Sequence, residues 1–195
     1  MCGTLTNETG SVRFDGHEMN GLAAHQRTHR GMARSFQLPR PFHTLSVAEN
    51  LRIPLLYTAH SRRGGHLSQA ESASRCEELA GLVGLAPKLH RLPRDLTQVE
   101  MRKLELARAI AADPKLLIAD EAMAGLSHSE VDDIVNLLLT LNGRGITVVM
   151  IEHIMRAVMA FSQRLVVLVS GKKIADGKPD DVVNNPEVIG AYLGQ

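Results

Sequence analysis

A short apolar run, Leu116 to Ala119, constrains the fold more than any other stretch of the sequence. From Met101 to Ala111 apolar residues recur at three- and four-residue steps, the spacing of one helical face. Asp113-Pro114 ends that helix, because proline cannot continue its hydrogen bonds. The apolar run is too short for a helix of its own and is typical of a strand that is buried on both faces. It ends abruptly at two carboxylates, Asp120 and Glu121.

The two carboxylates stand where a parallel sheet places its functional site. In open α/β sheets, ligands gather just outside the carboxyl ends of the strands. In P-loop NTPases an aspartate at this position helps to hold Mg²⁺, and a neighbouring carboxylate can orient or deprotonate a water molecule. The alternative is that Asp120 and Glu121 are loop residues that cap the next helix, and so short a motif does not by itself decide between the two.

A second apolar run, Ile146 to Ile151, ends in the same way, at Glu152-His153. The helix predicted between the two strands begins after Ser127, turns an apolar face inward from Val131 to Leu141, and ends near Gly143. A strand, a helix and another buried strand predict a right-handed crossover and a parallel sheet. The histidine should then lie near the two carboxylates at one edge of the sheet. A lone histidine is usually structural, but this placement favours a role in the site.

Capping boxes mark the predicted helix starts: a hydroxyl and a carboxylate three residues apart satisfy orphan backbone donors. The four pairs are Ser46 with Glu49, Ser68 with Glu71, Thr97 with Glu100, and Ser127 with Glu130. No strand pattern occurs from Val47 to Arg94, so residues 47–94 are predicted to form a helical subdomain inserted into the α/β body. Within it we place a flexible connection at Ser61 to Gly65.

The early part of the chain predicts smaller elements. Ser11 to Asp15 alternates apolar and polar residues between two glycines, which predicts a half-exposed strand followed by a turn. A short helix is predicted from Leu22 to His29, and a strand from Met32 to Phe36. Gln37 is therefore another polar side chain at a strand end.

The end of the chain, residues 165–195, predicts a hairpin and short helices after Pro179 and Pro186. The hairpin strands are Leu165 to Val169 and Lys172 to Ala175. Residues 1–195 are long enough to bury a proper core, and we treat them as a single domain.

The charge of the chain is balanced. With 22 basic and 21 acidic residues the formal net charge is +1, which gives no electrostatic reason to expect nucleic acid as a partner. The early part is locally basic, which we interpret as mostly a solvated face; its arginines are Arg27, Arg30, Arg34 and Arg40.

The two cysteines, Cys2 and Cys76, have no metal or redox spacing, so free thiols in a reducing compartment are expected. No run approaches the length of a membrane span, and Met1 to Gly10 lacks an apolar signal region. We therefore expect a cytosolic protein whose association with a membrane goes through a partner.

Taken in order, these parts resemble the nucleotide-binding domain of ABC transporters over nearly the whole chain. The resemblance implies an α/β fold of the P-loop NTPase class, with a mostly parallel sheet and an inserted helical subdomain. Gln37 looks like the family's Q-loop residue, Leu116 to Glu121 like its Walker B strand, and His153 like its switch histidine. The resemblance also implies that Glu121 and His153 are catalytic, and that Asp120 holds Mg²⁺ with Gln37 as a further contact. Two further segments would contact ATP: a signature motif with Thr97, Gln98, Val99 and Glu100, and a D-loop with Ala124, Gly125, Leu126 and Ser127.

Three stretches look more narrowly like an ATPase subunit of branched-chain amino-acid importers or their urea and amide relatives. They are ARSFQLPRPF at 33–42, RKLELARA at 102–109 and NNPEVIGAYLG at 184–194. This resemblance implies ATP and Mg²⁺ as cofactors. It also implies membrane permease subunits and a second ABC ATPase subunit as partners, in a homodimer or heterodimer at the inner face of the cell membrane. The transported substrate would be chosen by a binding protein and a permease on other chains.

The sequence also departs from the family pattern. No G-x-x-x-x-G-K-[ST] phosphate-binding loop occurs in it, and the Gly-Lys pairs at 171–172 and 177–178 are not followed by a hydroxyl residue. Val99 and Glu100 replace a glycine and a glutamine of the signature motif, Ala122 replaces a proline, and Ile154 replaces an acid. We therefore expect the fold to lack its first strand and phosphate-binding loop, together with the aromatic residue that usually stacks on adenine.

Two hypotheses remain open at this point. The chain is an ATP-hydrolysing importer subunit whose recorded sequence is truncated at its start, or it is a nucleotide-incompetent remnant. Such a remnant would serve at most as an interaction module that docks on a permease through the region from Gln37 to Leu51. Under either hypothesis we expect exposed apolar surface beside Leu116 to Ala119 and Val148 to Ile151.

Overall fold

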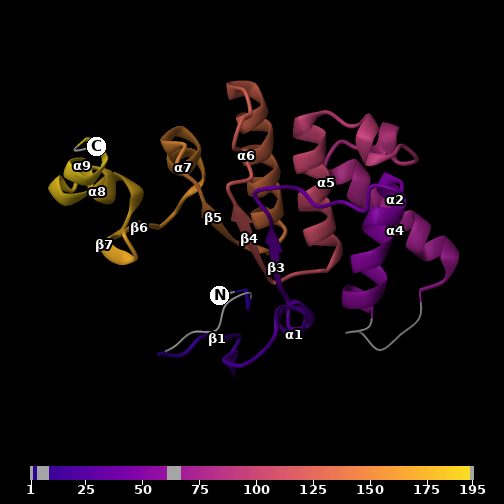
Figure 1. Ribbon diagram of the computed structural model, residues 1–195, viewed down its shortest axis with the longest axis horizontal. Helices are drawn as coiled ribbons and strands as arrows, with labels where there is room; N and C mark the ends of the chain where they lie inside the picture. Colours follow the sequence, from indigo (N-terminus) through magenta and orange to yellow (C-terminus); the bar gives the residue numbers. More distant parts are fainter. Residues whose placement is uncertain (1, 4–8, 61–66, 194–195) are drawn as a thin grey trace. The chain divides into compact units, whose positions relative to one another are not determined.

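A computed structural model describes residues 2–3, 9–60 and 67–193 of the chain (Figure 1). Its contacts divide the chain into two units, Met1–Glu152 and His153–Gln195. None of the helices among these residues is long and apolar enough to cross a membrane.

The first unit is built around a three-stranded parallel sheet. The strands are β3 (Met32–Ser35), β4 (Leu116–Asp120) and β5 (Thr147–Ile151), and β4 lies in the centre. The helix α5 (Gln98–Ala111) leads into β4, and α6 (His128–Gly143) connects β4 to β5. The predicted fold class, a mostly parallel α/β sheet with helices, is confirmed. The apolar run that ends in two carboxylates is the central strand.

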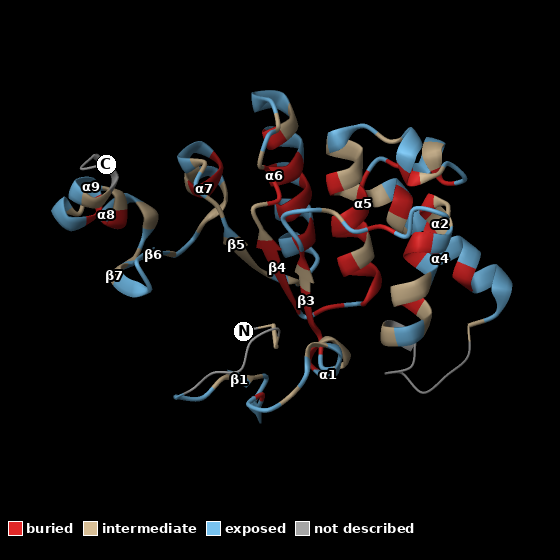
Figure 2. Cartoon of the chain, in the orientation of Figure 1, coloured by how far each residue is buried: buried red, intermediate tan, exposed pale blue. Residues whose placement is uncertain are grey.

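The central strand is buried on both faces, as Figure 2 shows in red. On one face, Leu116 and Ile118 pack with Met19 and Met32 in a core cluster. Partly buried hydrophobic residues close this cluster, and most of them come from the start of the chain: Cys2, Val12, Phe14, Leu22 and Val149. The expectation that Leu116 to Ala119 lies beside exposed apolar surface is therefore wrong, because the N-terminal segment covers it. In β5, by contrast, Ile151 is 49% exposed.

The N-terminal segment is a hairpin rather than the single strand expected from Ser11 to Asp15. Its strands, β1 (Arg13–Phe14) and β2 (His17–Glu18), are antiparallel, and only two residues on each side pair. Asp15 and Gly16 both have positive φ, 51° and 78°, as a tight two-residue hairpin turn requires. The turn therefore reverses the chain after Phe14.

The helix α1 (Ala24–His29) follows the hairpin, close to its predicted bounds. It corrects the interpretation of the early arginines as a solvated face. Arg27 is buried, and its Nε donates a hydrogen bond to the Leu22 carbonyl at 3.0 Å. Of the four, Arg30 and Arg40 are exposed, whereas Arg34 is half-buried.

Every described element between residues 47 and 95 is helical. These elements are α2 (Val47–Pro54), the π-helix η1 (Leu55–His60), α4 (Gln69–Leu82) and the 3₁₀ turns η2 (Ala86–Lys88) and η3 (Pro93–Asp95). The capping boxes at Ser46 and Ser68 form as predicted, each hydroxyl accepting the backbone N–H of the glutamate three residues later. The connection expected at Ser61 to Gly65 lies outside the described residues. That this region is a separate subdomain stays a prediction.

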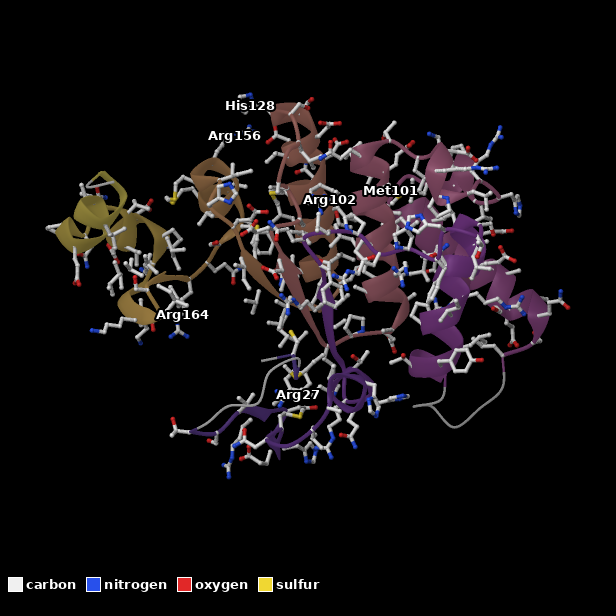
Figure 3. The ribbon with its side chains drawn as sticks, viewed as in Figure 1. Arg27, Met101, Arg102, His128, Arg156 and Arg164 are labelled. Atoms are coloured by element: carbon white, nitrogen blue, oxygen red, sulfur yellow. The ribbon has the colours of Figure 1, made fainter. Side chains whose placement is uncertain are left out.

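The second unit contains α7 (Met155–Phe161), the hairpin β6 (Leu165–Val169) and β7 (Lys172–Gly177), α8 (Pro179–Val183) and α9 (Pro186–Leu193). The hairpin and the two short helices after it are confirmed. Asp176 accepts hydrogen bonds from Arg164 at 2.8 and 3.0 Å and from Lys173 at 2.9 Å. Figure 3 labels Arg164 at this hairpin.

The loop that follows β3 is held in place by two polar networks, the first of which is centred on a buried side chain. Asn50 of α2 is fully buried, and its Oδ1 accepts the Phe42 N–H at 2.8 Å. Its Nδ2 donates to the carbonyls of Phe42, Leu45 and Ser46 at 3.1, 3.0 and 2.9 Å. One amide thus fixes the loop from 42 to 46.

The second network comes from α5. Arg108 donates to the Arg40 carbonyl at 2.7 Å and to Glu105 at 2.8 Å. Its guanidinium also lies over the Phe42 ring, 5.1 Å from the ring centroid. The loop after β3 is therefore attached to both α2 and α5, and it cannot move independently of them.

We expect Asn50→Ala to lower the free energy of unfolding by about 2–4 kcal/mol, because several buried backbone groups lose their partner. Urea unfolding followed by circular dichroism measures this. Asn136→Ala, at an exposed position of α6, is the matched control; it should change the free energy by less than about 0.5 kcal/mol. Equal small effects of the two variants would contradict the role assigned to Asn50.

Candidate functional site

The candidate site lies where β4 ends, and its two carboxylates have different partners. Glu121 Oε2 accepts a hydrogen bond from Gln37 Nε2 at 2.5 Å. Its backbone N–H donates to the Ile151 carbonyl at 2.9 Å, and its φ of 45° lies in the left-handed region. That conformation is costly for a residue with a side chain and is commonly found at functional sites. The structure thus joins two of the predicted site residues, Gln37 and Glu121.

Asp120, the other carboxylate, forms an ion pair with Arg34 of β3. The register explains the pair: Arg34 lies opposite Ile118, and side chains two residues apart on a strand point to the same face. Arg34 and Asp120 therefore share a face, and the long arginine reaches toward the carboxyl end of β4. Sequence reasoning missed this residue. A cation two residues before a strand end, beside a strand that ends in an acid, is the signal that could have identified it.

The chemistry of these oxygen atoms fits Mg²⁺ only in part. The described part of the chain contains no group of three or more histidine, cysteine or acidic residues that could hold a metal ion. Mg²⁺ usually takes one or two carboxylates and completes its shell with water and substrate phosphates, which suits Asp120. Gln37, however, is directed to Glu121. A joint Mg²⁺ site of Asp120 and Gln37 stays a prediction.

The N-terminus of α5 carries the segment from Thr97 to Glu100. Its capping box forms: Glu100 accepts the Thr97 N–H at 2.7 Å, and Thr97 Oγ1 accepts the Glu100 N–H at 3.3 Å. Lys88 also donates to Glu100, at 2.7 Å. Burial raises the pKa of the Glu100 carboxyl, but the hydrogen bonds from Lys88 and Thr97 outweigh burial, so the pKa lies below its ordinary value. The negative charge of Glu100 is thus compensated within the chain.

The segment from Ala124 to Ser127 packs against α5. Gly125 has a φ of 77°, and a Cβ atom built on it would lie 2.9 Å from the Gln98 side-chain nitrogen. Only glycine fits this position without strain. Ser127 opens α6, where its N–H and hydroxyl both donate to Glu130, at 2.8 and 2.7 Å. Two predicted site segments therefore contact one another directly.

Arg102 anchors the same segment from the side of α5 (Figure 3). Its side chain is buried, with 6% of the residue exposed, and Nη2 donates to the Ala124 carbonyl at 3.3 Å. Burial lowers the pKa of Arg102, while the charges of Glu152 and Glu105 raise it. Glu152, at the end of β5, accepts the Met123 N–H at 2.9 Å. The turn after Glu121 is therefore held by α5 and by β5.

His153 is the one predicted catalytic residue that belongs to the second unit. It follows Glu152 directly in the chain. Its predicted approach to Glu121 stays a prediction.

The sequence of the chain matches known protein families and individual relatives. A family model described as "ABC transporter" matches residues 1–124, and one described as "Branched-chain amino acid ATP-binding cassette transporter" matches residues 172–195. The chain is 35% identical to the high-affinity branched-chain amino acid transport ATP-binding protein BraF of Pseudomonas aeruginosa, covering 95% of this chain and 76% of BraF. It is 31% identical to the lipopolysaccharide export system ATP-binding protein LptB of Haemophilus influenzae, covering 100% of this chain and 78% of LptB.

The solved structures to which this chain is similar are also ATP-binding cassettes of ABC transporters. The chain is similar to MJ1267, an ATP-binding cassette of an ABC transporter, with a TM-score of 0.85 and 27% identity over 98% of this chain and 79% of the other. A nucleotide-free ATP-binding cassette from an ABC transporter gives a TM-score of 0.84 at 26% identity, covering 100% of this chain and 81% of the other.

Gly125→Ala is expected to lower the free energy of unfolding by about 1–2 kcal/mol, because an L-residue is strained at this φ. Gly81→Ala is the matched control: this glycine lies in α4, has no positive φ and has open space around it. There alanine should raise stability by about 0.5–1 kcal/mol, since glycine is the weaker helix former. Chemical denaturation measures both free energies of unfolding. Changes of the same sign in Gly125→Ala and Gly81→Ala would contradict this account.

Glu100→Gln tests the charge on α5. A carboxyl whose pKa is lower in the folded state stabilises the fold above its unfolded pKa, and this contribution disappears as pH falls through the folded pKa. At pH 7 we expect the variant to be less stable by about 0.5 kcal/mol, the usual size of a partly exposed ion pair. The difference between the two melting curves should vanish below the folded pKa of Glu100, in the acid range. A difference that persists at low pH would rule out the ion pair as its cause.

Proposed function

Because this chain belongs to the ABC transporter family, we propose that it is the ATP-binding subunit of an importer for branched-chain amino acids. The observation that carries the proposal is the contact between Gln37 and Glu121 at the end of β4, next to Asp120. The substrate class is supported by the name of BraF and by the family model that matches residues 172–195. The similarity to LptB, whose name refers to lipopolysaccharide export, makes an exporter the competing assignment.

In the proposed mechanism, Glu121 orients and deprotonates the water that attacks ATP. Gln37 donates to one oxygen of Glu121, which fixes the carboxylate and leaves its other oxygen for the water. Asp120 would hold Mg²⁺, which when bound supplies positive charge to the phosphates. His153 would donate a hydrogen bond toward the γ-phosphate.

The two segments that pack on each other, 97–100 and 124–127, would face the nucleotide of a second ATPase subunit. Gly125 and Gln98 are in contact, so movement of one segment would be transmitted to the other. The region from Gln37 to Leu51 would dock on the membrane permease; it comprises the loop after β3, which Asn50 and Arg108 hold, and the start of α2. The protein would then work in the cytoplasm, at the inner face of the membrane.

Residues 1–195 by themselves are proposed not to bind Mg-ATP measurably. Catalysis of phosphoryl transfer depends on positioning the phosphates, and the sequence contains no G-x-x-x-x-G-K-[ST] loop to do so. The second candidate function is therefore a non-catalytic module that docks on the permease. Val99 at the signature position favours this candidate, because its branched side chain hinders close approach of the backbone to a phosphate.

Calorimetry with Mg-ATP distinguishes the ATP-binding subunit from the non-catalytic docking module. The 195-residue polypeptide is expected to give no binding heat. A fusion that carries a relative's first strand and phosphate-binding loop ahead of Thr9 should bind the nucleotide, because the rest of the site is then complete. If the fusion hydrolyses ATP, Glu121→Gln should lower its rate by about 10²–10⁴-fold, the usual contribution of a general base.

Millimolar or tighter binding to the polypeptide alone would refute the proposed incompetence. A fusion that binds but does not hydrolyse would locate the defect in Val99 and Glu100. In that case, Val99→Gly with Glu100→Gln should recover turnover. Failure of the fusion to bind at all would favour the docking module.

A further inference from the structure

We propose that Arg34 is the internal cation of the site: its guanidinium holds the Asp120 carboxylate in the absence of metal, and a divalent cation must displace it. The proposal rests on the proposed function only in taking Asp120 as the metal-binding carboxylate. It adds a residue that competes with the metal, and so sets the order in which metal and nucleotide can bind.

Three observations fix Arg34 in this position. It forms an ion pair with Asp120 through Nη2 and Oδ2, and the two side chains are only 29% and 18% exposed. The guanidinium lies over the Phe36 ring, 5.3 Å from the ring centroid, which limits the directions in which it can swing. Arg34 Nε is buried and has no hydrogen-bond partner. The Asp120 contact is therefore the main polar anchor of this side chain.

Neighbouring cations have other partners. Lys115, at the start of β4, pairs with Asp15, and Arg27 donates to the Leu22 carbonyl at 3.0 Å. Among the described residues, Arg34 is thus the side chain whose ion pair neutralises Asp120. The pair is also directional, because the arginine belongs to β3 and the carboxylate to β4, in a fixed register.

A guanidinium and a divalent cation cannot share Asp120 freely. Both bind through the lone pairs of the carboxylate oxygens, and two cations at that distance repel one another. A free metal ion would leave the half-buried guanidinium without a counter-ion. A metal ion that is bound to phosphate brings a counter-ion for each side chain: the metal ion pairs with Asp120, and the phosphate pairs with Arg34. The site should therefore select metal bound to nucleotide over free metal.

The alternative is a purely structural ion pair that joins β3 to β4. Removal of Arg34 would then lower stability and leave metal affinity unchanged. Metal affinity in the absence of nucleotide is consequently the readout that separates the two roles.

The experiment uses the 195-residue chain and Mn²⁺ alone as the probe, with bound Mn²⁺ measured by electron paramagnetic resonance. Arg34→Gln should bind Mn²⁺ about tenfold more tightly than the unchanged chain, as expected when a competing ion pair of about 1.4 kcal/mol is removed. Arg75→Gln is the matched control, because it removes an arginine from another ion pair, with Glu78 at 2.6 Å on the surface of α4. The control should not change Mn²⁺ affinity.

Two further variants keep the result interpretable. Adding Asp120→Asn to Arg34→Gln should abolish the gain, which places the metal at that carboxylate. Arg34→Lys keeps the charge and should bind Mn²⁺ as weakly as the unchanged chain. Thermal unfolding gives a second readout: Mn²⁺ should raise the melting temperature of Arg34→Gln and not that of Arg75→Gln.

Mn²⁺ affinity that is the same in Arg34→Gln and Arg75→Gln would overturn the proposal, and so would a gain that survives Asp120→Asn. Because no nucleotide is present, this outcome is independent of whether the chain binds ATP. If calorimetry contradicts the proposed function, the Mn²⁺ measurement still tests the role of Arg34.

Discussion

Burial of β4 is the constraint on which the rest of the structure depends. One face of the strand is covered by residues from the start of the chain, Phe14 and Met19 among them, and β3 and β5 pair with its two edges. Polar side chains cannot lie along a strand that is covered on all sides. They can follow the strand at its carboxyl end, which is where ligands bind in open α/β sheets. Asp120 and Glu121 occupy that end, so the hydrophobic core determines where the carboxylates lie.

The carboxylates of the site are each matched by a positive or hydrogen-bonding group from another element. Asp120 pairs with Arg34, Glu100 with Lys88, and Glu121 accepts from Gln37. Half-buried acids that lacked such partners would repel one another and destabilise the fold. These contacts pair each carboxylate without a ligand, so a ligand of Asp120 or Glu121 would have to compete with groups of the protein. Under our proposal for Arg34, local stability and metal affinity are opposed at the end of β4.

Much of this arrangement could be predicted from the sequence, because it depends on local signals. Capping boxes located the starts of α2, α4, α5 and α6, and a short apolar run between a proline and two acids identified β4. Interactions that join distant segments were missed. Arg27 and Arg34 looked like members of a solvated basic run, whereas one is buried and the other reaches Asp120, 86 residues away. The N-terminal cover of β4 was missed for the same reason, since short strands such as Arg13–Phe14 carry almost no pattern.

The contacts that hold the site also explain how it can persist while its sequence departs from the family pattern. Gln37 lies in the loop that Asn50 and Arg108 attach to α2 and α5, and the turn after Glu121 is held by Arg102 and Glu152. None of these contacts involves a phosphate or depends on Val99. The requirements of a stable fold therefore account for the geometry of Gln37 and Glu121, whether or not a nucleotide binds. The presence of Glu121 is, for that reason, not by itself evidence of ATP turnover. The ion pair between Asp120 and Arg34 belongs to the same set of contacts, because it too joins two elements of the fold without a ligand.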